Sequence, residues 1–149
     1  MIKLIIEVVD LGISRMKKLP TSIQIVVKAE TPLNPSEYPE KVCSAINNVI
    51  DNCHIDSKYG RIVGRSIGGE SLNTIYEHIR SRAALGVLRK ALLDNRITDA
   101  TWFLLNKQAA VAGTVVLVEN KEESPLGAIK VTLECDELET VIDWLAPVA

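Results

Sequence analysis

Residues 101–135, TWFLLNKQAAVAGTVVLVENKEESPLGAIKVTLEC, decide the fold class. TWFLLNK has the composition of a buried strand, and AAVAGTVVLVE that of a second, apolar strand. AIKVTLEC alternates apolar and polar residues, as expected of a third strand with one buried face. Strands joined by connections this short must run antiparallel to their neighbours. The segment therefore predicts three consecutive antiparallel strands.

Helices are predicted on both sides of this segment. Residues 39–51, PEKVCSAINNVID, place apolar side chains at helical spacing behind a first-turn proline. Residues 136–145, DELETVIDWL, repeat the helical pattern at the end of the chain. Residues 22–29 and 59–69 are predicted to form further strands. The second segment contains several glycines, so we expect it to lie at a sheet edge or to contain a bulge. The prediction is an α+β fold in which helices pack on a mainly antiparallel sheet.

A third helix is predicted over residues 71–95, with Ser71 as its N-cap. It is the one long helix of the fold, beside two shorter ones. Its two halves turn their apolar faces in nearly opposite directions. Either the helix bends near Gly86 or the halves pack against different partners, in which case another subunit could cover the second half.

The bulk composition predicts one compact domain over residues 1–149. The chain is 47% hydrophobic with a net charge of −2, and its three cysteines favour free thiols in the reducing cytoplasm. Residues 1–15 form an N-terminal extension, a strand or short helix that is too short and too charged to span a membrane. We hypothesise that Met16 is an alternative start to Met1.

The charge is unevenly distributed along the chain. Residues 57–107 carry a net charge of +5, whereas residues 108–149 carry −6. On the predicted long helix Arg82, Arg89 and Arg96 recur every seven residues and share one side, which predicts a stripe suited to phosphate, with Arg61, Arg65 and Lys107 at its margins. The alternative is a solvated helix face that is partly paired with the acidic C-terminal third.

Two further segments are candidate contacts. Residues 60–71, GRIVGRSIGGES, combine glycines with arginines ahead of the long helix and could hold an anion, but a bulged strand followed by a loop is the favoured explanation. Asn106, Lys107 and Gln108 join two apolar strands without the glycine or proline of a tight hairpin. That mismatch predicts a specific contact, either inside the fold or with a ligand.

No motif of a catalytic, nucleotide or metal site stands out. The cysteines and the two histidines lack metal-ligand spacing, and no catalytic triad can be assigned. We therefore expect no cofactor, no bound metal, no small-molecule substrate and no enzymatic activity.

Three segments carry a family resemblance: PLNPSEYPEKVCSAINNV at 32–49, ALGVLRKALL at 84–93 and FLLNKQAAVAGTVVLVENKEESPLGAIKVTL at 103–133. Together they resemble archaeal uncharacterised protein family 0201, over roughly residues 22–147. The resemblance implies a fold similar to that of the ribosomal protein that binds the small RNA of the large subunit, and a distant relationship to a predicted archaeal exosome subunit. Arg89, Asn106, Lys107 and Gln108 are the matching positions of interest.

These observations predict a non-enzymatic, RNA-associated binding module of the cytoplasm. Because only 4% of the residues are aromatic, we expect recognition of shape or backbone with weak sequence preference. The alternative is a structural or interaction protein without nucleic-acid binding, most simply a homodimer. In it the arginine stripe of one subunit would face the acidic C-terminal region of the other.

Overall fold

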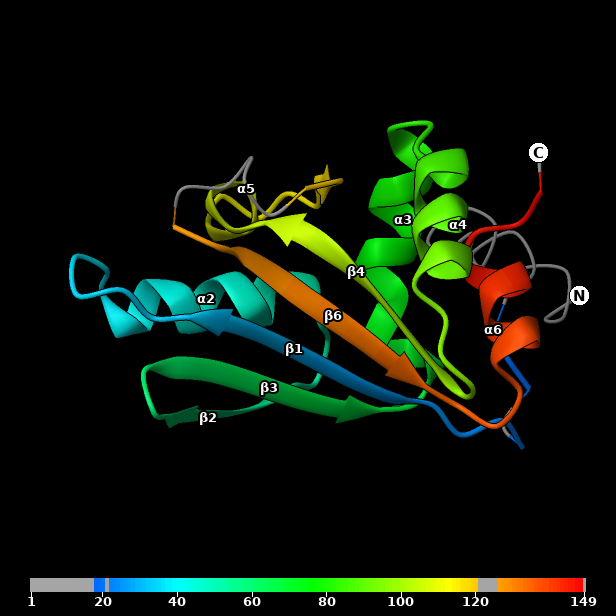
Figure 1. Ribbon diagram of the computed structural model, residues 1–149, viewed down its shortest axis with the longest axis horizontal. Coiled ribbons are helices and arrows are strands. Elements are labelled where there is room, and N and C mark those ends of the chain that lie inside the picture. The colour runs from blue at the N-terminus through cyan, green and yellow to red at the C-terminus, as the bar shows by residue number, and fades with distance from the viewer. Residues whose placement is uncertain (1–17, 21, 121–125, 149) are drawn as a thin grey trace, which may run out of the picture.

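The computed structural model describes residues 18–20, 22–120 and 126–148, which form one α+β domain (Figure 1). The predicted N-terminal extension and Met16 lie outside these residues. The strands are β1 Val26–Pro32, β2 His54–Lys58, β3 Arg61–Ile67, β4 Ala100–Asn106, β5 Leu117–Val118 and β6 Ala128–Glu134. The helices are α2 Pro39–Val49, the 3-10 turn η1 Gly69–Leu72, α3 Asn73–Ser81, α4 Leu85–Asp94, α5 Lys107–Val111 and α6 Leu138–Leu145.

The strands form one antiparallel sheet in the order β2-β3-β1-β6-β4-β5. β1 lies near the centre, where Val27 is aligned with Ser66 of β3 and with Leu133 of β6. This arrangement confirms the predicted antiparallel α+β fold. It corrects the expectation that β3 is an edge or bulged strand, because β2 covers its outer side and its pairing with β1 is uninterrupted from Arg61 to Ile67.

One face of the sheet forms the core with the helices. Val27, Ala29, Val131 and Leu133 point into this core and are fully buried. Figure 1 shows α2 and α5 at one end of the sheet and α3, α4 and α6 gathered at the other. We call the opposite face the open sheet face, because the buried apolar residues of the described helices all join the core on the first side.

The two shorter helices follow their sequence patterns. α2 begins at a first-turn proline and buries Val42, Ile46 and Val49. The buried residues of α6 are Leu138, Val141, Ile142, Trp144 and Leu145. Apolar side chains three or four residues apart lie on one side of a helix, so local spacing was sufficient to predict both helices.

The predicted long helix is wrong. α3 ends at Ser81, and Ala83 adopts a left-handed conformation with φ 54°. The amide of Ala84 donates to the carbonyl of Ile79 and the amide of Ala83 to that of Arg80, which is the Schellman pattern of a helix end. The chain then changes direction into α4. Leu88 of α4 is buried in the same core as α3, so no second subunit is needed to cover it.

Two other expectations need correction. The second strand of residues 101–135 is only Leu117–Val118, because the preceding residues form the single helical turn of α5. Ser71 does not cap a helix; its hydroxyl instead lies 2.6 Å from that of Ser66. β2 was not predicted, since its residues are mostly exposed and carry no apolar alternation.

No helix in the described ranges is long and apolar enough to cross a membrane.

Candidate nucleic-acid interface

Arg61 and Arg65 lie on β3, with their side chains on the open sheet face. Both residues are exposed, whereas Ile62 between them is buried in the core. Strand geometry explains this, because successive side chains point to opposite faces of a sheet. The predicted anion loop of residues 60–71 is thus mainly a strand, and its two arginines belong to a sheet surface.

The strand register places Arg65 in a row of aligned side chains that crosses five strands. His54 pairs with Arg65, and Arg65 with Lys28. Lys28 pairs with Thr132, which pairs with Trp102. Directly opposed residues share a face, so these five side chains form what we call the cross-strand row. The row places basic groups at the β2 end and an indole at the β4 end.

Cations outnumber carboxylates on the open sheet face. The cations are Lys28, Lys58, Arg61, Arg65 and Lys130, and the carboxylates are Glu30, Asp56 and Glu134. This excess stands out in a chain whose net charge is −2. Within the described residues no carboxylate pairs with Arg65, although Lys28 and Arg61 both pair with one.

Glu30 holds two of these cations in place. Its carboxylate lies 3.2 Å from Lys28 Nζ and 3.1 Å from Arg61 Nη2. Partial burial disfavours its ionisation, but the hydrogen bond and charge of Lys28, together with those of Arg61, outweigh that cost and lower the pKa of Glu30. The face therefore presents oriented cations around one shared carboxylate.

Trp102 is the large aromatic ring of the open sheet face. Lys130 Nζ lies 4.9 Å from the centre of the indole, within the range of a cation–π contact. The ring packs beside a small apolar cluster of Leu104, Val118 and Ala128, separate from the main core. Its half-buried position leaves part of the indole at the surface.

The structure separates the three arginines of the predicted stripe. Arg82 lies exposed at the break between α3 and α4. Arg89 donates to Asp143 at 2.9 Å and to the carbonyl of Ala146 at 2.9 Å. The straight stripe that the long helix would have formed is therefore absent, because the helix ends after Ser81.

Arg96 meets the same acidic helix, with 3.3 Å between its Nη1 and the carboxylate of Glu139. Two of the three arginines thus face α6 of their own chain, as the solvated-face alternative anticipated for the acidic C-terminal third. The same contacts supply, inside one chain, the charge match that motivated a homodimer.

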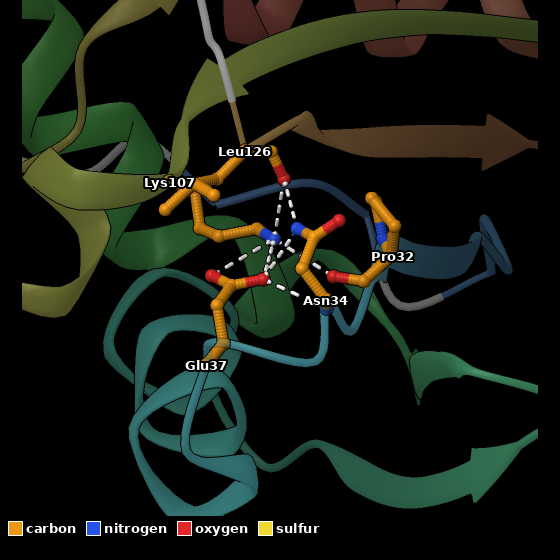
Figure 2. Close-up of polar contacts among 5 residues, drawn as sticks. All are labelled: Pro32, Asn34, Glu37, Lys107 and Leu126. Atoms are coloured by element: carbon orange, nitrogen blue, oxygen red, sulfur yellow. Dashed lines mark hydrogen bonds and ion pairs between the residues drawn. The ribbon is translucent and has the colours of Figure 1, made fainter.

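Asn106 and Lys107 make their specific contacts inside the fold. The side-chain oxygen of Asn106 accepts a 2.8 Å hydrogen bond from the amide of Ala109 and caps α5. Lys107 is only 1% exposed, and its Nζ donates to Glu37 and to the carbonyls of Pro32 and Leu126 (Figure 2). The expectation that Lys107 contacts phosphate is not met, because its ammonium is buried and occupied.

Figure 2 also shows how Glu37 is held from two sides. Besides Lys107, the backbone and side-chain nitrogens of Asn34 donate to the same carboxylate oxygen at 3.0 and 2.6 Å. Burial opposes ionisation, but these hydrogen bonds and the charge of Lys107 outweigh it and lower the pKa of Glu37. The ion pair joins the end of β1, the turn before α2 and the start of α5.

Gln108 remains exposed beside this ion pair. It borders an open hollow of about 350 Å³ between α2 and α5, together with Tyr38, Lys41 and Val111. Lys107 and Glu37 form part of its wall, but their polar atoms are already bonded to one another. We therefore treat this hollow as a by-product of α2–α5 packing.

The described residues hold no group of three histidine, cysteine or acidic side chains placed to bind a metal ion. Cys43, Cys53 and Cys135 are free thiols. Burial raises the pKa of Cys53 to about 11, so this thiol is protonated at neutral pH.

Sequence reasoning missed Lys28, Lys130 and Trp102 as surface candidates. The alternation of AIKVTLEC does place Lys130 and Thr132 on one side of a strand. What could not be read from one sequence is that β6 lies between β1 and β4, which brings Trp102 into line with the basic residues.

Comparisons with known proteins cover most of the chain. A family model described as RNA binding matches residues 26–135, a range that includes all six strands. A UPF0201 protein of Sulfurisphaera tokodaii is 38% identical over 128 residues, covering 83% of this chain and 87% of that protein. A UPF0201 protein of Methanothermobacter thermautotrophicus is 38% identical over 125 residues, covering 81% and 90%.

Solved structures agree with these sequence matches. The crystal structure of one UPF0201 protein superposes with a TM-score of 0.72 at 27% identity, covering 83% of this chain and 94% of that one. The UPF0201 protein from Methanococcus jannaschii gives a TM-score of 0.67 at 26% identity, covering 85% and 94%.

Proposed function

The chain belongs to the archaeal UPF0201 family, as its sequence predicted, and from this premise we propose that it binds RNA through the open sheet face. The family model is described as RNA binding. The proposal is one of binding alone, in the cytoplasm, with no catalytic step and no cofactor.

The observation that carries the proposal is the cross-strand row with the cations around it. Lys28 and Arg65 stand side by side on adjacent strands, and Arg61 lies on the same face of β3. Lysine and arginine bind phosphate oxygens directly and release counterions from the nucleic acid, which supplies most non-specific affinity. Three cations on neighbouring strands can contact successive phosphates.

The arginine stripe is the competing surface. Arg89 and Arg96 lie against the carboxylates of Asp143 and Glu139, so a phosphate approaching there meets negative charge from α6. Such exposed pairs are individually weak, but their carboxylates cancel the local positive charge. We therefore place the phosphate contacts on the sheet and leave Arg82, which has no ion pair within the described residues, as the test of the stripe.

The experiment is fluorescence-anisotropy binding of a short RNA at several salt concentrations. Wild type is compared with Arg65→Glu on the open sheet face and with Arg82→Glu at the helix break. Both substitutions reverse one exposed arginine, so their effects on net charge are matched. We expect Arg65→Glu to weaken binding at least tenfold and to reduce the salt slope by about 1, the value for one lost phosphate contact.

Three results would count against the proposal. Absence of RNA binding by the wild type removes it. Binding that is indifferent to salt removes the phosphate contacts. If Arg82→Glu weakens binding and Arg65→Glu does not, the interface lies at α3–α4 and the open sheet face is excluded.

A further inference from the structure

A second feature is a hollow at the edge of β4, where the open sheet face borders α4 on the core side, which we call the edge notch. It has a volume of about 280 Å³ and lies between α4 and β5. Val87 and Ala91 of α4, Val118 of β5 and Trp102 of β4 give it apolar walls. Trp102 thus belongs to both the cross-strand row and the lining of the notch.

The short length of β5 creates this notch. β5 pairs only with Leu104 and Leu105, so β4 continues past it to Trp102. The side-chain amide of Asn95 donates to the carbonyl of Trp102 at 2.9 Å and holds the end of α4 against this part of β4. α4, β4 and Trp102 therefore border the notch, and the Asn95 hydrogen bond fixes α4 relative to β4.

The rim of the notch has the opposite charge to the open sheet face. Lys90 is paired with Asp94 at 2.7 Å, and Glu119, also on the rim, is exposed. Two carboxylates against one ammonium disfavour a phosphate at this position. A carboxylate does accept hydrogen bonds from the exocyclic amino group of a base, such as N4 of cytosine.

Building on the proposed RNA binding, we infer that the RNA is single-stranded and that one base stacks on Trp102 at the edge notch. The exocyclic amino group of this base donates a hydrogen bond to the carboxylate of Glu119. Bases in a duplex are already stacked and paired, so only an unpaired base can enter. Cytosine fits this description, whereas uracil lacks the amino group.

The cross-strand row supplies the path of the RNA backbone. With about 4.8 Å between neighbouring strands, His54 and Trp102 are roughly 19 Å apart across the sheet. An RNA backbone whose phosphates are bound by Arg65 and Lys28 therefore runs along the row towards the indole. Lys130, already 4.9 Å from the centre of that ring, is placed to meet the phosphate next to the stacked base.

Trp102 itself provides the test. The chain has two tryptophans, and the other, Trp144, is buried against Tyr76. In a Trp144→Phe background the emission therefore reports on Trp102 alone. Ten-nucleotide oligocytidine and oligouridine are titrated while anisotropy of the labelled RNA is followed in parallel, for this protein and for Glu119→Gln and Trp102→Leu made in the same background. Circular dichroism confirms that each variant is folded.

We expect oligocytidine to quench Trp102 and to bind several-fold tighter than oligouridine. Glu119→Gln should remove most of that preference. Trp102→Leu should weaken oligocytidine binding roughly tenfold, the usual loss for one stacked base.

RNA binding without quenching, or with equal affinity for the two oligonucleotides, overturns the stacked-base inference and leaves the proposed function standing. Absence of RNA binding in the anisotropy signal overturns both.

Discussion

Lys107 Nζ lies 3.0 Å from the carboxylate of Glu37, and the two side chains are only 1% and 10% exposed. The same ammonium donates to the carbonyls of Pro32 and Leu126 at 2.7 and 2.9 Å. One lysine at the start of α5 therefore satisfies polar groups from three other places in the chain.

Replacing this lysine should cost much of the stability of the fold. Lys107→Met keeps the length of the side chain but leaves the Glu37 carboxylate buried without its ammonium. Breaking one side of a buried pair typically costs about 3–5 kcal/mol. Urea unfolding should show this loss, with Lys41→Met, an exposed lysine of α2, as the control. Equal stability of the two variants would contradict the assigned role.

The same ion pair predicts an acid-dependent part of the stability. The pKa of Glu37 is lowered in the folded protein, so the folded state binds fewer protons than the unfolded state in the acid range. The stabilisation is present above the ordinary value of 4.5 and disappears as the pH falls through the lowered pKa.

The difference in unfolding free energy between wild type and Glu37→Gln should therefore shrink as the pH falls below about 4.5. Urea unfolding at a series of pH values measures it. Glu40→Gln, which removes an exposed carboxylate from the first turn of α2, controls for loss of charge alone. A difference that stays constant with pH would show that Glu37 does not titrate as proposed.

Thr31 offers a stabilising substitution. It is fully buried, and its hydroxyl has no hydrogen-bond partner within the described residues. Valine has nearly the same shape without the buried polar group, so Thr31→Val should raise the unfolding free energy by about 1 kcal/mol. Thr31→Ser keeps the hydroxyl and removes the methyl group, and it should lower stability. A loss of stability in the valine variant would reveal an unrecognised partner.

Substitution of two glycines by alanine should change the stability of the fold in opposite directions. A Cβ at Gly64 would clash with the sulfur of Cys53 and lie 2.8 Å from Ile46, so Gly64→Ala should cost about 1–3 kcal/mol. A Cβ at Gly86, in the first turn of α4, meets nothing within 4 Å. Gly86→Ala should raise stability by about 0.5–1 kcal/mol. Thermal unfolding of both variants checks the contrast; similar changes would mean that β3 tolerates a side chain here.

Local sequence patterns correctly predicted the elements whose structure depends mainly on residues close together in the chain. The apolar spacing of α2 and α6 and the alternation of β6 are set by neighbours in sequence, and each was found from residues within one element. The mismatch at residues 106–108 predicted a specific contact, either inside the fold or with a ligand, and Lys107 makes its contact inside the fold. Its partner, Glu37, lies 70 residues away in sequence, so the sequence could not identify it.

The errors have a different physical origin. Alanine is the strongest helix former, so nothing at Ala83 predicts a left-handed residue that ends α3. The change of direction is favoured by burying α3 and α4 in one core, which is a tertiary effect. The proposed interface likewise depends on strand order, since Lys28, Thr132 and Trp102 are brought together from three separate strands.

The central pairing of β1 with β6 has a consequence during synthesis. Val27 and Leu133 are neighbours in the sheet, but about a hundred residues must be translated between them. Contacts this distant in sequence form late, so β1 can pair with β3 on the nascent chain while its other edge waits for β6. A translation product that stops before residue 128 would expose that hydrogen-bonding edge to other copies. Stalled synthesis should therefore yield aggregation-prone fragments, which makes this protein dependent on completing its last strand.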